Sequence, residues 1–332
     1  MTSILVTGGT GSFGQEFVRT LLTLPELVDV TPFGSTRQQY VPGAGSRYDR
    51  IIVFSRDELK QHDMRANGFD DDRIRWFIGD VRDRDRLRRA MQGVEIVVHA
   101  AAMKQVPACE YNPIEAKRTN VDGAQNVIDA ALDSGVERVL ALGTDKAVDP
   151  VNLYGATKLV AEKLFIDANA YGGYGTKFSC TRYGNVISSR GSVLPLFQDQ
   201  YARGEQLTVT DPNMTRFVLT LRKAVEFVLF ALERMEGGEV FVPKPPAVTV
   251  ATMAIAASWP DKPNVKTIGM RPAEKRHELL VSENELREEH PDFYIVGRGD
   301  RGPAVSSETT KRLSFRELRT LVGFQRTLEE AS

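Results

Sequence analysis

Five side chains with complementary chemistry lie within the fifteen residues from Thr144 to Lys158. Two of them, Tyr154 and Lys158, are four residues apart, so a helix would place them one turn apart on a single face. An ammonium held near a phenol favours the phenolate and lowers the pKa of the phenol toward neutrality. Tyr154 is therefore a candidate base for a hydroxyl proton, with Lys158 as its partner. The alternative is that both are ordinary helix residues, because a Tyr-x-x-x-Lys pair taken alone is weak evidence.

The other three side chains, Thr144, Asp145 and Lys146, closely follow the apolar segment 138–142, which is typical of a buried strand. In open parallel α/β sheets, ligands bind beyond the carboxyl ends of the strands. A hydroxyl, a carboxylate and an amine would therefore meet the phenol at one site. The alternative for Asp145 and Lys146 is a solvated charge pair at a strand end. The predicted catalytic group is Thr144, Asp145, Lys146, Tyr154 and Lys158.

A glycine-rich turn near the start of the chain connects a β-like run, Ser3–Thr7, to an amphipathic helix that extends to about Leu22. Gly8 permits a tight turn, Gly11 lets the backbone approach a pyrophosphate, and Gly14 permits close packing of the helix on the strand. The free N–H groups at the start of the helix would face the phosphates. A strand, a glycine turn and a helix in this order indicate a dinucleotide site. Its expected contacts are Gly8, Thr10, Gly11, Ser12, Phe13 and Gly14.

The residues after the next three predicted strands extend this cofactor site. After the strand at 50–54, Ser55 and Arg56 come before any carboxylate, and Arg at a strand end favours the 2′-phosphate of NADP over the free 2′-hydroxyl of NAD. The alternative is that Arg56 only faces solvent. Asp80 is placed to accept a hydrogen bond from an adenine amino group, and small residues after the strand at 96–99 let the backbone approach the cofactor. The further expected cofactor contacts are Ser55, Arg56, Asp80, Val81, Ala100, Ala101, Ala102, Lys104, Tyr154 and Lys158.

The alternation of strands and helices predicts an α/β fold with a doubly wound parallel sheet of the Rossmann type. We expect residues 1–186 and about 216–245 to form the dinucleotide-binding domain, and about 187–215 and 246–332 to form a smaller α/β lobe over the strand ends. One continuous helix is expected for Pro113–Ser134. A Pro- and Gly-rich stretch at about 25–48 interrupts the pattern. We interpret it as an insertion without function, the alternatives being a flap or an oligomer contact.

The composition is that of an ordinary globular protein. The 332 residues include 43 Lys and Arg and 44 Asp and Glu. The formal net charge of −1 gives no reason to expect a nucleic-acid or anionic-membrane partner. No apolar run is long enough to span a bilayer, and no signal-peptide pattern is present. The two cysteines imply no disulfide framework, which fits a reducing cytoplasm. The four histidines show no ligand spacing, so we expect no metal.

Several motifs together resemble the soluble UDP-N-acetylglucosamine 4,6-dehydratases that invert C-5, in the extended short-chain dehydrogenase/reductase superfamily. The resemblance extends over residues of about 3 to 324. It implies that the Rossmann sheet carries a smaller nucleotide-sugar-binding lobe. The motifs are the glycine turn, Phe54–Glu58, Ala102–Val106, Thr144–Ala147, Asn152–Lys158, Arg182–Val186, Met214–Phe217 and Gly269–Lys275.

This resemblance implies an NADP-dependent hydro-lyase that acts on UDP-N-acetylglucosamine. The reaction would oxidise C-4, remove water across C-5 and C-6, return hydride to C-6 and protonate C-5 from the opposite face, giving UDP-2-acetamido-2,6-dideoxy-β-L-arabino-hexos-4-ulose. Tyr154 would take the proton of the 4-hydroxyl, Lys146 the proton of C-5, and Asp145 would protonate the leaving 6-hydroxyl. A homo-oligomer, from dimer to hexamer, is also implied. The expected substrate contacts are Lys104, Asn185, Val193, Thr208, Thr210, Met214, Arg216, Arg271 and Glu274.

Two departures from the family pattern leave the preferred sugar open. Gly143 stands where the family often has Ser, and Ala273 stands where it usually has Gly. A C-5-retaining dehydratase and a nucleotide-sugar epimerase remain as alternatives; an epimerase would use Tyr154 and Lys158 but would need no base for C-5. A non-catalytic NADP-sensing protein is a further alternative, although it would have no reason to keep both the Tyr/Lys and the Asp/Lys pairs.

Overall fold

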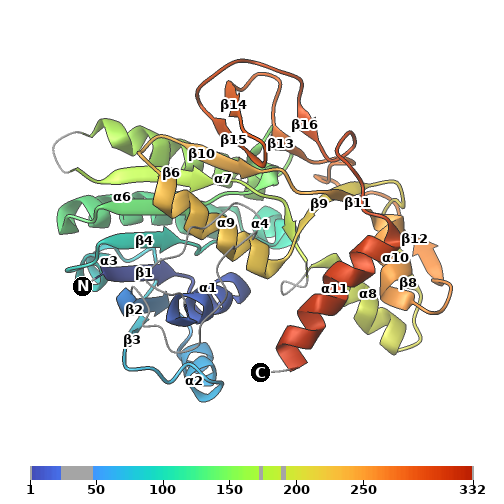
Figure 1. The fold of residues 1–332 in the computed structure, drawn as a ribbon, viewed down its shortest axis with the longest axis horizontal. Coiled ribbons are helices and arrows are strands. Elements are labelled where there is room, and N and C mark those ends of the chain that lie inside the picture. The colour runs from blue at the N-terminus through green and yellow to red at the C-terminus, as the bar shows by residue number, and fades with distance from the viewer. Residues whose placement is uncertain (1, 24–47, 172–174, 188–191, 331–332) are drawn as a thin grey trace.

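The fold is taken from a computed structural model, which describes residues 2–23, 48–171, 175–187 and 192–330. Within that part of the chain, the largest sheet has nine strands (Figure 1). Neighbouring strands from β10 to β3 are parallel, whereas β15 and β14 are added antiparallel. This confirms the predicted α/β fold with a doubly wound parallel sheet. In order across the sheet, the strands are β14 (Arg287–Glu289), β15 (Phe293–Val296), β10 (Val240–Pro243), β6 (Lys177–Thr181), β5 (Arg138–Leu142), β4 (Ile96–His99), β1 (Thr2–Thr7), β2 (Tyr48–Ser55) and β3 (Ile74–Ile78).

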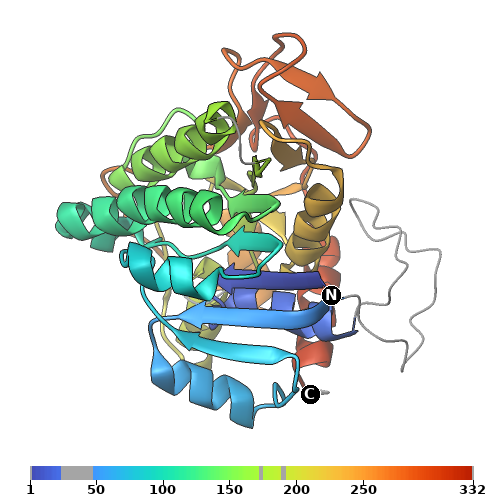
Figure 2. The ribbon, with the colours of Figure 1, turned by 90° about the vertical axis from the view of Figure 1, so that its left-hand side faces the viewer.

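Helices cover both faces of this sheet, as Figure 2 shows. On one face lie α1 (Ser12–Thr23), α2 (Glu58–Ala66) and α9 (Leu221–Arg234); on the other lie α3 (Arg84–Ala90), α6 (Gly123–Ser134) and α7 (Leu153–Asp167). Side chains alternate along each strand, so Ile4 and Val6 join the first hydrophobic cluster while Leu5 joins the second. The sheet is therefore buried on both faces, and the loops at its strand ends are left to form the site.

The segment expected to be one helix, Pro113–Ser134, is helical throughout, with a π-helical turn inside it. It consists of α5 (Pro113–Lys117), a π-helical turn η1 (Arg118–Asp122) and α6, and it is preceded by the short helix α4 (Val106–Tyr111). The π turn carries Asn120, whose side chain is buried and bonded to a neighbouring loop.

A smaller lobe lies beside the carboxyl ends of the central strands, and its own hydrophobic cluster includes Phe197, Val218, Val248 and Leu318. The helix α11 begins with the reciprocal Ser314–Glu317 bonds of a capping box. The elements of the lobe are β7 (Asn185–Val186), α8 (Val193–Ala202), β8 (Leu207–Val209), β9 (Thr215–Leu219), β11 (Ala247–Thr249), α10 (Val250–Ser258), β12 (Val265–Thr267), β13 (Leu279–Val281), β16 (Val305–Ser306) and α11 (Phe315–Glu330).

The structure departs from the expected division of the chain at two places. Strands β14 and β15, which fall in the range assigned to the smaller lobe, extend the main sheet through β10. Strand β9, which falls in the range assigned to the dinucleotide domain, pairs instead with β7 and β11. Of the stretch at about 25–48 only Tyr48 is described; it begins β2 and is buried, and the rest lies outside the described residues.

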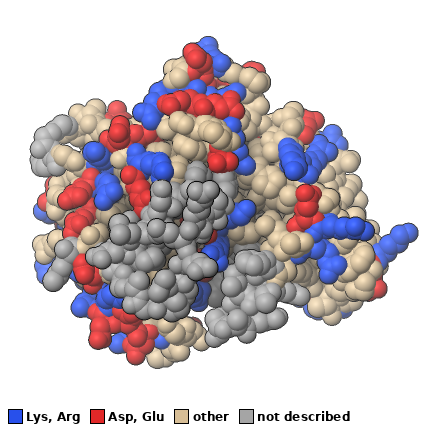
Figure 3. Space-filling view, in the orientation of Figure 1, with Lys and Arg blue, Asp and Glu red and all other residues tan. Residues whose placement is uncertain are grey.

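The one face seen in Figure 3 shows no large area of a single charge sign. On the face seen in Figure 3, Lys and Arg are interspersed with Asp and Glu over the visible part of the molecule. In the described ranges, no helix combines the length and the apolar character that crossing a bilayer requires.

Candidate active site

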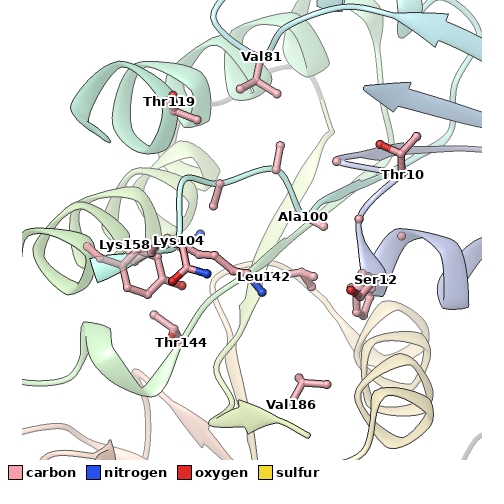
Figure 4. A pocket seen from close by; sticks show the side chains of 18 of the residues that line it. Thr10, Ser12, Val81, Ala100, Lys104, Thr119, Leu142, Thr144, Lys158 and Val186 are labelled. Atoms are coloured by element: carbon pink, nitrogen blue, oxygen red, sulfur yellow. The ribbon is translucent and has the colours of Figure 1, made fainter. Parts of the chain in front are cut away.

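A cavity of about 670 Å³ opens where the glycine turn meets the ends of the central strands. Figure 4 shows Thr10 and Ser12 at one side of this cavity and Lys104 and Lys158 at the other, with Thr144 close to the lysines. Every residue predicted to contact the cofactor lines it except Asp80. The predicted residues that line it are Gly8, Thr10, Gly11, Ser12, Phe13, Gly14, Ser55, Arg56, Val81, Ala100, Ala101, Ala102, Lys104, Tyr154 and Lys158.

The glycine turn has the close approaches that the sequence predicted. Gly8 has a φ of +68°, and a Cβ there would lie 3.0 Å from backbone atoms of Ala101. A Cβ on Gly14 would lie 2.4 Å from the carbonyl oxygen of Gly9, so only glycine lets α1 pack this closely on the turn. The first residues of α1, Ser12, Phe13 and Gly14, line the cavity, and a glycine turn followed by a helix N-terminus fits the pyrophosphate of a dinucleotide.

Near the end of β2, a cationic group lines the cavity and an anionic group lies beside it. The hydroxyls of Ser55 and Thr10 are 2.7 Å apart and buried. The guanidinium of Arg56 is exposed and lies 3.5 Å from the carboxylate of Asp80. Burial alone would raise the pKa of Asp80, but hydrogen bonds from Arg82 and the charge of Arg56 lower it. The two arginines thus keep Asp80 ionised. Asp80 itself does not line the cavity.

The loop after β4 is fixed to the site helix α7 by one buried amide. Asn120 accepts a hydrogen bond from the backbone N–H of Met103 at 2.8 Å and donates to its carbonyl oxygen at 2.9 Å. The same side chain donates to the hydroxyl of Thr157 in α7 at 3.0 Å. The loop that carries Ala100 to Lys104 therefore has a defined position relative to Tyr154 and Lys158.

The predicted catalytic residues meet at one place. A short 3₁₀ turn, η2 (Asp145–Ala147), follows β5, and the side chain of Asn152 caps α7 by accepting from the N–H of Gly155 at 2.8 Å. The Asp145 carboxylate accepts hydrogen bonds from the Thr144 hydroxyl and the Lys146 amine, both at 3.0 Å. The Thr144 hydroxyl also lies near the Tyr154 phenol, where it lowers the pKa of that group.

The charges around Tyr154 differ from the expectation. Burial raises the pKa of the Tyr154 phenol, and the groups that oppose this most are Lys146 and Thr144, not Lys158. The Lys158 amine is buried, and burial lowers its pKa. No hydrogen bond or ion pair joins its Nζ to another residue in the described ranges. A buried amine without a protein partner at a cavity wall fits a ligand hydroxyl, such as that of a nicotinamide ribose.

Lys146 lies between two carboxylates. Its Nζ is 3.0 Å from Asp145 Oδ1 and 3.7 Å from Glu278 Oε1, and it also bonds the Asn185 side chain at 3.4 Å. Burial alone would lower the pKa of Lys146, but the two carboxylates outweigh it and raise that pKa. A base needs a neutral amine, so Lys146 must first lose its proton within the site before it can accept one from a substrate.

A second cavity of about 750 Å³ adjoins the first, because Lys146, Asn185, Val106 and Pro107 line both. Arg216, Arg271 and Glu274, all predicted substrate contacts, line this second cavity. Other predicted substrate contacts are not brought to either cavity: Val193, Thr208, Thr210 and Met214 lie in or against the interior of the smaller lobe. The Met214 sulfur there accepts from Thr210 and Arg216, so its contribution is to position Arg216.

Two findings about carboxylates were not predicted. Asp145 is fully buried and lines neither cavity, because it lies behind Thr144 and Lys146. Glu278, which lines the second cavity, was missed. The only available signal was its place shortly after the Gly269–Lys275 motif, and the sequence gives no indication that it reaches Lys146.

Comparisons with known proteins agree on one family. The family described as "Polysaccharide biosynthesis protein" matches residues 32–298. The chain is 47% identical over 300 residues to the UDP-N-acetylglucosamine 4,6-dehydratase (inverting) of Campylobacter jejuni serotype O:23/36, covering 89% of this chain and 82% of that one. It is 40% identical over 342 residues to the UDP-glucose 4-epimerase of Rickettsia massiliae, covering 96% and 95% of the two chains.

A solved structure supports the same fold. The crystal structure of Pen from Bacillus thuringiensis superposes with a TM-score of 0.85 at 34% identity, and the alignment covers 97% of each chain. The arrangement of the main sheet and the smaller lobe is therefore shared over nearly the whole length.

Proposed function

Since the chain belongs to the polysaccharide biosynthesis protein family, within the extended short-chain dehydrogenase/reductase superfamily, we propose that it is a UDP-N-acetylglucosamine 4,6-dehydratase that inverts C-5. The observation that carries this proposal is the cluster of Tyr154, Lys158, Thr144 and Lys146 where the two cavities meet. The similarity to the Campylobacter jejuni dehydratase supports the same substrate and reaction.

The first step needs a base at the 4-hydroxyl of the sugar. Tyr154 takes that proton, and Thr144, which lines the same cavity beside Tyr154, is in place to bond the 4-oxygen. The positive charge of Lys146 favours the phenolate. A bound NADP would supply the oxidation at C-4 and the matching reduction at C-6, with no net change in the cofactor. Lys158 would hold its ribose.

The second step removes a proton from C-5, which the 4-ketone has made acidic. Lys146 is the amine that lines both cavities, and we assign it the role of the base that takes this proton. Its ion pairs mean that the proton it carries must first move to a neighbouring carboxylate. Asp145 was the expected acid for the 6-hydroxyl, but the proposed function does not depend on which carboxyl group fills that role.

The sugar nucleotide would occupy the second cavity. Arg216 and Arg271 offer guanidinium groups, whose planar donors match phosphate oxygens. Asn185, Glu274 and Lys104 are assigned to hydroxyl groups of the substrate. For the cofactor we propose NADP in preference to NAD, since Arg56 and Ser55 stand at the end of β2. A homo-oligomer in the cytoplasm belongs to the same proposal.

An epimerase is the second candidate, and it is supported by the 40% identity to the Rickettsia massiliae enzyme over 96% of the chain. The two activities differ in the mass of the product. Incubation of the purified protein with UDP-N-acetylglucosamine, followed by mass analysis, should give a product lighter by one water. A product of unchanged mass, with a new configuration at C-4, would favour the epimerase and refute the dehydratase.

A further inference from the structure

Glu278 is a buried carboxylate that the mechanism above does not use. Only 3% of its surface is exposed, yet it lines the second cavity together with Lys146 and Arg216. Its main chain is fixed on both sides by Ser307, whose hydroxyl accepts from the Glu278 N–H and whose N–H donates to the Glu278 carbonyl oxygen, each at 2.9 Å. Its Oε2 has no hydrogen-bond partner within the described ranges; the same is true of Asp145 Oδ2, but Asp145 lines neither cavity. A buried carboxylate oxygen without a donor is costly unless a ligand or a proton satisfies it.

The charges that face Glu278 come from η2, from β9 and from the loop before β13. Lys146 Nζ and Arg216 Nε lie 3.7 Å and 3.8 Å from its Oε1, Lys275 is a third cation nearby, and the carboxylate of Asp145 also acts on it. Burial raises the pKa of Glu278, and the three cations only partly oppose this. Glu278 therefore takes up a proton more readily than an ordinary carboxylate does.

Elimination of water needs an acid and a base close together. The hydrogen on C-5 and the oxygen on C-6 are on adjacent carbons, so one base and one acid a few ångströms apart serve both. Lys146 Nζ and Glu278 Oε1 satisfy this at 3.7 Å, and both groups line the second cavity. Asp145 is closer to Lys146, at 3.0 Å, but it is fully buried behind it and lines neither cavity.

We propose that Glu278, and not Asp145, is the acid that protonates the leaving 6-hydroxyl, as the partner of Lys146. This inference rests on the proposed function. A proton moves from Lys146 Nζ to Glu278, leaving a neutral amine and a neutral carboxylic acid. The amine takes the C-5 proton, the electron pair of that bond forms the C-5/C-6 double bond, and the C-6–oxygen bond breaks. The departing oxygen takes the proton of Glu278 and leaves as water.

This cycle balances and restores the starting charges, an ammonium on Lys146 and a carboxylate on Glu278. Substrate that fills the cavity excludes water, and removal of water favours the neutral amine and acid over the ion pair. Asp145 then acts as a positioning residue, because its Oδ1 holds the Thr144 hydroxyl and the Lys146 amine at 3.0 Å.

The test compares two leaving groups in one variant. Fluoride leaves without a proton, so UDP-6-deoxy-6-fluoro-N-acetylglucosamine bypasses the acid, and its elimination is followed by fluoride release. For Glu278→Gln, the ratio of the rate with the fluoro substrate to the rate with the hydroxyl substrate should rise about 100-fold or more above that of the wild type. For Asp145→Asn, the ratio should stay near the wild-type value, although both rates fall.

The ratio is measured within one protein, so a partly folded variant does not disturb it. Glu285→Gln is the matched control, because Glu285 follows β13 in the same segment but pairs with Arg182 rather than with the site; its ratio should equal that of the wild type. A ratio that rises in Asp145→Asn and not in Glu278→Gln would overturn the assignment. If the wild type eliminates neither water nor fluoride, the proposed function itself fails.

Discussion

Gly155 directly follows Tyr154 and sets how closely the site helix α7 lies against η2. A Cβ at Gly155 would lie 2.1 Å from the carbonyl oxygen of Lys146 and 3.1 Å from a side-chain atom of Pro150. A carbon and an oxygen in contact need roughly 3.2 Å, so Gly155→Ala must separate α7 from η2 by about 1 Å. This separation moves Tyr154 and Lys146 apart.

The expected effect is on catalysis more than on folding. A misplacement of about 1 Å in an active site costs roughly 100-fold in rate, or about 3 kcal/mol in the activation free energy. The free energy of unfolding should change by only about 2 kcal/mol or less, since alanine gains about 1 kcal/mol in helix propensity and overpacking costs about 1–3 kcal/mol.

The assay is the rate of water loss from saturating UDP-N-acetylglucosamine, measured beside a urea unfolding curve. Gly323→Ala is the matched control, because Gly323 is also in a helix and a Cβ there would meet nothing within 4 Å. The control should keep the wild-type rate. If Gly155→Ala also keeps a rate within about twofold of the wild type, the helix position is not what aligns the site and this reasoning is wrong.

Three further predictions concern stability. Ala273 has a φ of +67°, so Ala273→Gly should raise the free energy of unfolding by about 1 kcal/mol in urea titration; a decrease would mean that the methyl group makes contacts that outweigh the strain. Arg182 is buried and pairs with Glu162 at 2.6 Å and Glu285 at 2.9 Å, so Arg182→Met should cost about 3–5 kcal/mol, and a loss below 1 kcal/mol would contradict this. Burial lowers the pKa of His99 to about 3. Below the ordinary pKa of 6.5, the unfolded chain therefore binds a proton that the folded chain does not. The free energy of unfolding should fall by about 2 kcal/mol between pH 7.5 and pH 5. His99→Gln should lack this loss, and an equal loss in that variant would assign it to other groups.

The parts of the fold that sequence could predict are those with strong local signals. Apolar runs such as 51–54 and 138–142 became strands of the main sheet, and the glycine turn was found because only glycine fits positions such as Gly8 and Gly14. The Tyr154/Lys158 spacing located the site helix correctly. These features depend on neighbours a few residues away, which the sequence displays directly.

The features that sequence could not predict depend on distant partners. Strands β14 and β15 are short, and only their pairing onto β10 makes them part of the main sheet. The contact between Glu278 and Lys146 joins segments far apart in the chain, and it gives the amine a second carboxylate that further raises its pKa. Burial of Asp145 behind Lys146 is likewise set by tertiary packing, so the choice of acid could not be made from residue type alone.

The central claim is that a transient 4-ketone makes the C-5 hydrogen acidic and that Lys146 removes it. The most direct measurement is NMR of the product formed from UDP-N-acetylglucosamine by the wild-type protein in heavy water. We predict a product without its 6-hydroxyl, with deuterium at C-5 and with the configuration of C-5 inverted. A product whose C-5 keeps the original hydrogen would contradict the account.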